Sequence, residues 1–229
     1  MRCLQEVASG RCPLKPDLGY VVVEGPIGVG KTTVCNLLAS SWNAGTILEE
    51  VEENPFLPRF YRNRKAWAFQ TQLFFMLSRY RQQQKLAQLD LFRKKFVADY
   101  MFAKDRIFAS INLKDDEFVL YEKLSAVLVC DIPQPDLVIY LQGSCDSLFR
   151  RISSRGRSFE NDVSRSYLEK LTDAYNDYFF RARKHPTLVV NTDHADFRHK
   201  GEDFNQLLEA IENHSGGIES FVPKLGGRR

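Results

Sequence analysis

Short runs of apolar, β-branched residues alternate along the chain with longer stretches in which apolar residues recur at helical spacing. The first run, Gly19–Glu24, contains three successive valines and predicts a strand that is buried on both faces, as in parallel sheets. Four later runs predict further strands at residues 46–49, 96–99, 136–141 and 187–191. Strands that alternate with helices predict an α/β fold, with a five-stranded parallel sheet flanked by helices.

The longest helical pattern covers Lys65–Leu91, where no glycine or proline interrupts it. Similar patterns predict helices at residues 32–42, 101–113, 117–129, 146–154, 164–183 and 204–213. The segment 54–58, which contains two prolines, is predicted as a loop. Since no internal repeat or linker is evident, we predict one domain over residues 19–213, an N-terminal extension over 1–18 and a flexible, glycine-rich C-terminal tail over 214–229.

Composition narrows the class of protein without identifying it. The chain has 229 residues, of which 44% are hydrophobic, enough for a sizeable core. Its formal charge of +3 is too small to indicate nucleic acid as a partner, and no apolar run approaches the roughly 20 residues of a membrane span. The N-terminus lacks the apolar segment of a secretory signal. The five cysteines are scattered, which predicts free thiols in the cytoplasm rather than disulfides or a zinc site.

The segment from Gly25 to Thr32 matches the pattern G-x-x-x-x-G-K-[ST], and it lies between a predicted buried strand and a helix, where this pattern binds phosphate. Its glycines let backbone N–H groups point at the phosphates of ATP, Lys31 reaches the β- and γ-phosphates, and the Thr32 hydroxyl binds Mg²⁺. The alternative is a glycine turn that matches this pattern by chance, but such a turn would not need a strand before it and a helix after it. The predicted nucleotide-binding residues are Gly25, Pro26, Ile27, Gly28, Val29, Gly30, Lys31, Thr32 and Thr33.

Four arginines lie within eight residues, at positions 150, 151, 155 and 157. Arg151 and Arg155 share a helix face because they are four residues apart, and Arg157 follows Gly156, where the chain can turn. One interpretation is a solvated basic helix end. The other is a lid that closes over ATP, in which these three arginines neutralise the transferring phosphoryl group, since this reaction depends mainly on positioning and charge.

Three further segments add to the phosphate loop and the arginines: Leu-Glu-Glu-Val-Glu-Glu-Asn-Pro at 48–55, Trp-Ala-Phe-Gln at 67–70 and Arg-Ser-Phe-Glu at 157–160. This combination resembles the deoxynucleoside kinase family, and most closely its bacterial-type deoxyadenosine/deoxyguanosine kinase branch. The resemblance covers residues 19–213. It implies a P-loop NTPase-type fold with an arginine-rich lid, transfer of phosphate from ATP to the 5′-hydroxyl of a deoxynucleoside, a requirement for Mg²⁺ and a homodimer.

The resemblance also implies a catalytic carboxylate. Glu49, at the end of the second predicted strand, is similar in position to the family's carboxylate that takes the proton of the 5′-hydroxyl. A carboxylate at a strand end that faces the phosphate loop suits that role. Glu50, Glu52 and Glu53 stand close by, so the assignment to one residue stays open, and a solvated acidic loop is the alternative.

Three further residues match substrate-binding positions of the family. Tyr61 and Glu160 resemble the pair that holds the sugar 3′-hydroxyl, and Gln70 resembles the glutamine that hydrogen-bonds the base. An ordinary polar helix residue is the alternative for Gln70. Aromatic residues nearby could wall the base or simply pack in the core: Trp67, Phe69, Phe74 and Phe102.

One departure from the family pattern follows the third predicted strand. The family has an acidic residue and then arginine, whereas this chain has Asp99 and then Tyr100. The missing cation could come from Lys104 or Arg106, and a rival alignment puts Asp105 and Arg106 in the motif itself. Asp105 is also a possible base reader, because an ionised carboxylate accepts from an exocyclic amino group. The amide of residue 70 alone does not decide between bases, but the resemblance to the purine branch, together with Asp105, implies a preference for deoxyadenosine, then deoxycytidine and deoxyguanosine, and thymidine last.

Other classes of protein fit the residues less well. The N-K-x-D motif of GTPases is absent. A nucleoside monophosphate kinase of thymidylate-kinase type needs a cationic site for the acceptor's phosphate, whereas residues 49–53 are acidic. A non-catalytic nucleotide-binding regulator would retain the loop but neither Glu49 nor the arginines. The apolar segment 73–77 predicts burial of the long helix on more than one face, in a homodimer interface or else deep in the core.

Overall fold

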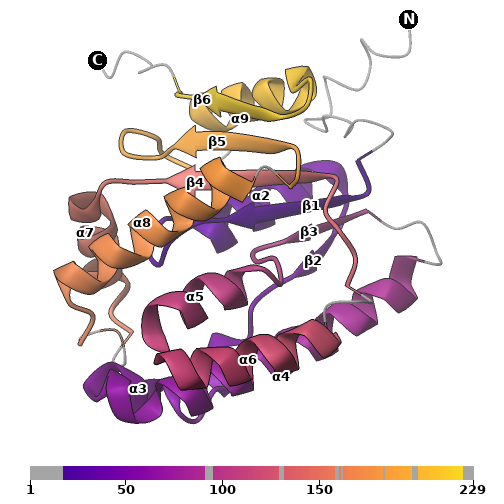
Figure 1. The fold of residues 1–229 in the computed structure, drawn as a ribbon. Coiled ribbons are helices and arrows are strands. Elements are labelled where there is room, and N and C mark those ends of the chain that lie inside the picture. Colours follow the sequence, from indigo (N-terminus) through magenta and orange to yellow (C-terminus); the bar gives the residue numbers. More distant parts are fainter. Residues whose placement is uncertain are drawn as a thin grey trace, which may run out of the picture.

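The computed structural model describes residues 18–90, 95–128, 132–157, 160, 162–182, 184–197 and 201–223. Their strands form a parallel sheet in the order β2-β3-β1-β4-β5-β6 (Figure 1). The strands are β1 (Tyr20–Glu24), β2 (Gly45–Ile47), β3 (Phe96–Ala98), β4 (Leu137–Gln142), β5 (Thr187–Asn191) and β6 (Ile218–Phe221). The predicted α/β fold with a helix-flanked parallel sheet is confirmed.

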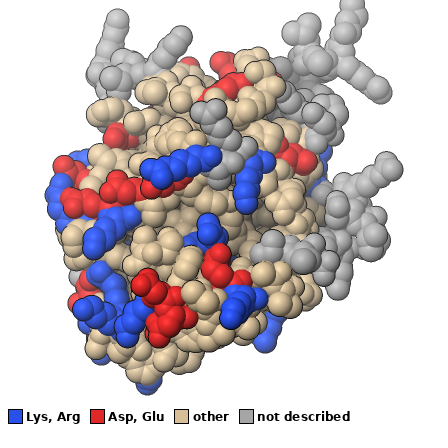
Figure 2. Space-filling view, viewed as in Figure 1, with Lys and Arg blue, Asp and Glu red and all other residues tan. Residues whose placement is uncertain are grey.

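Helices connect the strands and cover the sheet (Figure 1). They are α2 (Lys31–Trp42), α3 (Leu57–Arg62), α4 (Arg64–Asp90), α5 (Lys104–Asn112), α6 (Asp115–Leu128), α7 (Cys145–Arg155), α8 (Arg165–Ala182) and α9 (Glu202–Asn213), with a 3₁₀ turn, η2 (Val51–Glu53). In the described part of the chain, none of them has the length and apolar character to cross a membrane. Charged side chains of both signs are interspersed over the face seen in Figure 2.

Alternate residues of the central strand β1 face opposite layers of helices. Val21 and Val23 pack into a cluster with residues of α2, α7 and α9, whereas Tyr20 and Val22 pack into a second cluster with residues of α5 and α8. Because both faces of β1 are covered, all five of its residues are buried. This explains why the strand is a continuous apolar run until Glu24.

The chain moves from β1 to β2 and β3 on one side of the sheet, then crosses to β4, β5 and β6 on the other side. Ligands of open parallel sheets bind beyond the carboxyl ends of the strands, where the strand order reverses. The phosphate loop, residues 25–30, follows β1 directly at this point. A third, smaller cluster joins α4, α5 and α6, and it is built around Met76, Ala109 and Tyr121.

Two predictions of local structure are wrong. Residues 218–221 belong to the predicted flexible tail, yet they form β6, which pairs with β5. Gly216 and Gly217 have φ values of 118° and 70°, so they make the turn that returns the chain to the sheet after α9. Helix α3 begins within the predicted loop 54–58, because Pro58 lies in its first turn, where a proline needs no N–H partner. Of the predicted extension 1–18, the structure describes Leu18 alone. Residues 224–229 at the end of the predicted tail also lie outside the described part of the chain.

Candidate active site

Two cavities meet at the phosphate loop. The first, of about 270 Å³, is lined by residues of the loop, η2, α3, α4, α5 and the segment after α7. The second, of about 800 Å³, lies between the loop, α7 and the segment 192–197. Both are lined by Gly28, Lys31, Thr32, Arg155 and Arg157. A group bound at these shared residues would therefore be accessible from both cavities.

The phosphate loop depends on glycine at positions with little space. Gly25 and Gly28 have φ values of 149° and 82°, and a Cβ atom on them would lie 2.4 Å from the Leu141 carbonyl oxygen and 2.7 Å from Ile152 Cγ1, respectively. Lys31, at the start of α2, donates to the carbonyl oxygens of Gly25 and Pro26 at 2.9 and 3.0 Å. Desolvation, followed by the nearby Lys104 ammonium, lowers the pKa of Lys31 to about 8.

Two oxygen ligands suitable for a hard cation lie beside the loop. The Thr32 hydroxyl donates to Asp99 Oδ2 at 2.6 Å, and Asp99 Oδ1 accepts from the backbone N–H of Glu49 at 2.8 Å. Asp99 follows β3, which is the neighbour of β1, so parallel pairing brings the two side chains together. A hydroxyl, a carboxylate and the phosphates of a nucleotide are ligands that suit Mg²⁺.

Glu49 lies in the first cavity between two cations. Its Oε1 accepts from Arg79 Nε at 3.0 Å and Nη2 at 2.6 Å, and its Oε2 accepts from Lys104 Nζ. Burial raises the pKa of Glu49, but Lys104 and Arg79 outweigh this effect, so the pKa lies below its ordinary value and the carboxyl group is ionised. The neighbouring carboxylates at 50, 52 and 53 are exposed and do not line the cavity.

A polar cluster of Gln72, Arg79 and Asp105 lies beside the first cavity, which Gln72 and Arg79 line and from which the fully buried Asp105 is set back. Gln72 of α4 donates through Nε2 to the carbonyl oxygen and Oδ1 of Asp105, at 2.8 and 2.7 Å, and Arg79 Nη1 also donates to Oδ1. Asp105 Oδ2 is buried without a hydrogen-bond partner among the described residues. Burial raises the pKa of Asp105, against the lowering effect of Arg79.

The prediction that Gln70 lies in the site is wrong. Gln70 is exposed and does not line either cavity, whereas Gln72 is buried and does. Two residues along an α-helix turn the side chain by about 200°, so only one of the two glutamines faces inward. The spacing of Ala68, Gln72 and Phe75, continued by Arg79, marks the inward face and would have indicated Gln72 and Arg79.

The structure decides between the alternatives that followed the third strand. Lys104 reaches Glu49, while Arg106 is exposed and forms an ion pair with Glu122 at 2.9 Å. Asp99 is bonded to Thr32 at the phosphate loop, whereas Asp105 is fully buried and is bonded to Gln72 and Arg79, so Asp99 occupies the motif position. Tyr100 is buried and donates its hydroxyl proton to Gln82 Oε1, so its position in the motif supplies no cation.

The arginines predicted to form the lid divide into two groups. Arg155 pairs with Glu160, donating from Nε to Oε2 at 3.2 Å, and Arg157 lies 3.4 Å from Glu52 and 3.9 Å from Glu160. Arg151 differs from them because it lines the second cavity but not the first, and it donates to the carbonyl oxygens of Val29 at 3.1 Å and Thr192 at 2.6 Å. Residues 158, 159 and 161 lie outside the described part of the chain.

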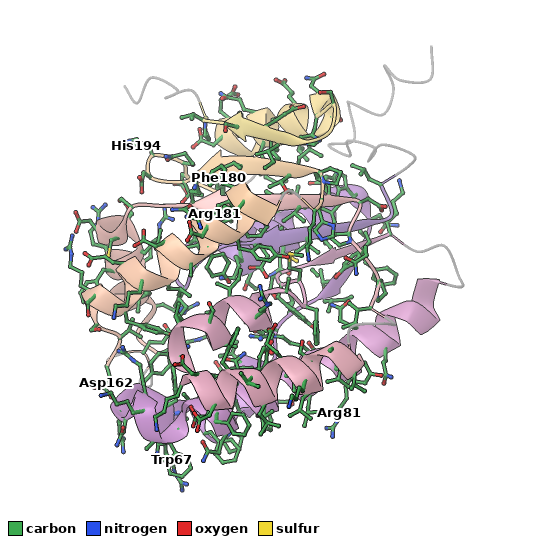
Figure 3. The ribbon with its side chains drawn as sticks, in the orientation of Figure 1. Trp67, Arg81, Asp162, Phe180, Arg181 and His194 are labelled. Atoms are coloured by element: carbon green, nitrogen blue, oxygen red, sulfur yellow. The ribbon has the colours of Figure 1, made fainter. Side chains whose placement is uncertain are left out.

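Of the other predicted substrate contacts, Tyr61 and Glu160 both line the first cavity. Burial raises the pKa of Tyr61 well above its ordinary value, so its hydroxyl is neutral. Trp67 does not line this cavity; it stacks on Phe56 at 6.0 Å between ring centroids and lies at the lower edge of the molecule (Figure 3). The aromatic residues that do line the cavity are Phe60, Tyr61, Phe75 and Phe108.

Comparison with known proteins identifies the family. The model of the family described as "Deoxynucleoside kinase" matches residues 21–215. The deoxyguanosine kinase of Bacillus subtilis (strain 168) is 37% identical to this chain, and the aligned part covers 84% of this chain and 96% of that protein. The deoxyadenosine kinase of Lactobacillus acidophilus is 31% identical, and the aligned part covers 84% of this chain and 94% of that protein. A structure of deoxyadenosine kinase from M. mycoides with bound dATP has a TM-score of 0.72 at 24% identity, over 85% of this chain and 98% of that one. The chain belongs to the deoxynucleoside kinase family.

Proposed function

We propose that this phosphotransferase moves the γ-phosphoryl group of ATP to the 5′-hydroxyl of a deoxynucleoside, and that it prefers deoxypurine nucleosides. The observation that carries this proposal is the pair of cavities that share Lys31, Arg155 and Arg157. ATP fits the larger cavity, the nucleoside fits the smaller one, and the transferred group passes between them at the shared cations.

On the donor side, the backbone N–H groups of the loop and the α2 N-terminus bind the phosphates, and Lys31 leaves the two loop carbonyls to bind the β- and γ-phosphates. Thr32 and Asp99 would hold Mg²⁺, which neutralises phosphate charge when bound. Arg155 and Arg157 stabilise the transferring group. Arg151, held at Val29 and Thr192, contacts the nucleoside part of ATP rather than the reacting phosphate.

On the acceptor side, Glu49 accepts the hydrogen bond of the 5′-hydroxyl and takes its proton as the 5′-oxygen bonds to the γ-phosphorus and the bond from that phosphorus to ADP breaks. Its lowered pKa makes it a weak base, which suffices because the phosphoryl transition state is loose and needs mainly an oriented nucleophile. Tyr61 and Glu160 hold the 3′-hydroxyl. Arg79 and Lys104 are already paired with Glu49, so this end of the cavity suits a neutral acceptor better than a nucleoside monophosphate.

For the base, Gln72 and Arg79 line the first cavity, and the buried Asp105 beside them has one oxygen, Oδ2, without a hydrogen-bond partner among the described residues. Asp105 accepts from an amino group, and Arg79, which the sequence analysis did not include, can donate to a carbonyl group. Deoxyguanosine therefore joins deoxyadenosine ahead of deoxycytidine, with thymidine last. The test is kcat/KM for the four deoxynucleosides at one ATP concentration, with each monophosphate as a control acceptor. Thymidine as the best substrate, or transfer only to monophosphates, would contradict the proposal.

The two glutamines of α4 provide a matched pair for the base site. Gln72→Ala is expected to lower kcat/KM for deoxypurine nucleosides by roughly 10- to 100-fold, because a polar pair at a base edge contributes about 1–3 kcal/mol. Gln70→Ala should retain the wild-type value, since its side chain is exposed. Steady-state kinetics gives kcat/KM for both variants. A large loss in Gln70→Ala with a normal value in Gln72→Ala would show that the base does not bind at Gln72.

Lys104 and Arg106 form a second pair. Lys104→Met should lower kcat by about 10²-fold, the typical effect of removing one group that stabilises transition-state charge, because Lys104 replaces the cation missing at Tyr100. Arg106→Met should leave kcat unchanged, since its ion pair with Glu122 is exposed. Single-turnover measurements with saturating ATP separate this effect from binding. Equal, small effects of both substitutions would show that the chemistry does not use Lys104.

We propose further that the protein is a homodimer through α4 and α6. Val119, Leu120, Leu124 and Val127 of α6 are 40–77% exposed, and Leu77 of α4 is 46% exposed. Leu120, Leu124 and Val127 form a stripe along one face of α6, and the contact between α4 and α6 brings Leu77 to the same side of the molecule.

The substitution Leu124→Glu is expected to convert the dimer into a monomer, because it places a charge in an apolar interface. Phe180→Glu on α8 is the matched control, since Phe180 has a similar exposure of 42% but lies away from this face (Figure 3). Sedimentation at micromolar concentration measures the mass. A wild-type species of only 26.5 kDa would contradict the dimer.

The thiols are consistent with a reducing compartment, and we propose the cytoplasm. Cys35 and Cys145 are free cysteines in the structure. The other three, Cys3, Cys12 and Cys130, lie outside the described residues.

A further inference from the structure

Glu24 is a completely buried carboxylate at the end of β1, directly before the phosphate loop. It accepts three hydrogen bonds. Its Oε2 accepts from the backbone N–H of Gly25 at 2.9 Å and from the Tyr175 hydroxyl at 3.2 Å, and its Oε1 accepts from the backbone N–H of Met101 at 2.8 Å. The other residues of β1 are one tyrosine and three valines, so Glu24 is the charged residue of an otherwise uncharged strand.

The three donors belong to different parts of the machinery. Gly25 opens the phosphate loop. Met101 lies in the short connection between Asp99, which is bonded to Thr32, and Lys104, which is bonded to Glu49. Tyr175 belongs to α8, the helix that follows the lid, and its ring lies edge-on to Phe108, which lines the first cavity. One side chain therefore joins the donor side, the acceptor side and the helix after the lid.

Charge also favours a carboxylate at this place. An apolar side chain would fill a buried strand position without the large cost of burying a charge. Burial raises the pKa of Glu24, while the positive charges of Lys104 and Lys31 act in the opposite direction and favour its ionised form, and the three donors satisfy its oxygens. Burial is the main cause of the lowered pKa of Lys31, and repulsion by Lys104 adds to it, so a negative charge near both ammonium groups lets them lie close together.

We propose that Glu24 is a positioning residue for phosphoryl transfer: it fixes the phosphate loop relative to the connection 99–104, so that the γ-phosphate and the 5′-hydroxyl are held in line. This proposal rests on the proposed function. Glu24 contacts neither substrate, and its effect passes through Gly25 and Met101. Its loss should therefore impair the alignment of two bound substrates more than the binding of either one.

The test is Glu24→Gln in the full-length protein. An amide has one acceptor oxygen, and its NH₂ group would face at least one of the backbone N–H donors, so the three-way junction cannot persist. We expect kcat to fall by about 10²-fold, the effect of a displacement of roughly 1 Å between reacting groups. The Kd values of ADP and of the deoxynucleoside, measured separately by calorimetry, should stay within about threefold of wild type.

Asp136→Asn is the matched control. Asp136 lies next to the other end of β1, where its Oδ2 accepts from the backbone N–H groups of Gly19 and Tyr20 at 2.7 and 2.8 Å. If the loss of any carboxylate that anchors β1 were enough to lower kcat, both Glu24→Gln and Asp136→Asn would have a lower kcat, and the proposal would be overturned. A wild-type kcat in Glu24→Gln, or weaker binding of either substrate with unchanged kcat, would overturn it as well.

Tyr175→Phe provides a second test if Glu24→Gln does not fold. It removes one donor and keeps the carboxylate and the ring packing, so kcat should fall in the same direction by a smaller factor with binding unchanged. If Glu24→Gln does not fold and Tyr175→Phe keeps the wild-type kcat, Glu24 has a purely structural role and the proposal is overturned. Failure of the proposed function is distinct, since the wild-type protein itself would then transfer no phosphate to deoxynucleosides.

Discussion

Lys31→Ala is expected to lower kcat by about 10³-fold or more while leaving the fold intact. Lys31 is the first residue of α2 and lines both cavities, and among the described residues its ammonium donates to two loop carbonyls, so it contributes little to the core. In the transition state it would neutralise charge on the transferring group, and removal of one such preorganised donor costs about 10²–10³-fold even where others remain.

The measurement is kcat at saturating ATP and deoxynucleoside, together with the thermal unfolding temperature. Lys65→Ala is the control, because Lys65 is an exposed lysine in the first turn of α4. Turnover near the wild-type value in Lys31→Ala would mean that the loop does not bind the reacting phosphates. The proposal that ATP binds in the larger cavity and the nucleoside in the smaller one would then be wrong.

Glu49→Gln should lower kcat by about 10²–10⁴-fold, the range for loss of a general base. The amide keeps the shape and one acceptor oxygen, but it loses the charge that holds Arg79 and Lys104 and that orients the 5′-hydroxyl. ATP affinity should change little, since Glu49 lines only the first cavity.

Glu52→Gln and Glu53→Gln are the natural comparisons, because these neighbours share the acidic segment but are exposed. Each should retain most of the wild-type kcat. Circular dichroism on all three variants checks that the fold persists, given that Glu49→Gln leaves two buried cations with one fewer negative partner. A large loss in Glu52→Gln with normal turnover in Glu49→Gln would mean that the base has been assigned to the wrong carboxylate.

The features that sequence revealed are those encoded within a few neighbouring residues. The loop 25–32 is recognisable because its glycines, lysine and threonine follow a buried strand, and the structure places Gly28, Gly30, Lys31 and Thr32 at the second cavity. Four of the five predicted strands, β1, β3, β4 and β5, are recognisable because both of their faces are buried, whereas β2 is only partly buried. β6 was missed since a four-residue strand after two glycines carries the same pattern as a loose tail.

The missed features depend on tertiary contact. Arg79 is 30 residues from Glu49 and 26 from Asp105 along the chain, and in the sequence of a polar helix it resembles an exposed arginine, because only the packing of α4 against α5 buries it. Gln70 was chosen over Gln72 because a motif gives sequence position but not helical phase. Arg151 shares a helix face with Arg155, yet its side chain turns toward Thr192, which no spacing rule predicts.

The most direct test of the account is a crystal structure of the protein with ADP and a deoxypurine nucleoside. We predict the 5′-oxygen within hydrogen-bond distance of the Glu49 carboxylate, about 2.6–3.2 Å, with the base edge on Gln72 and Asp105 and the ADP phosphates on the loop. A nucleoside whose 5′-oxygen points away from Glu49, or whose base lies outside the cavity near Gln70, would contradict the account.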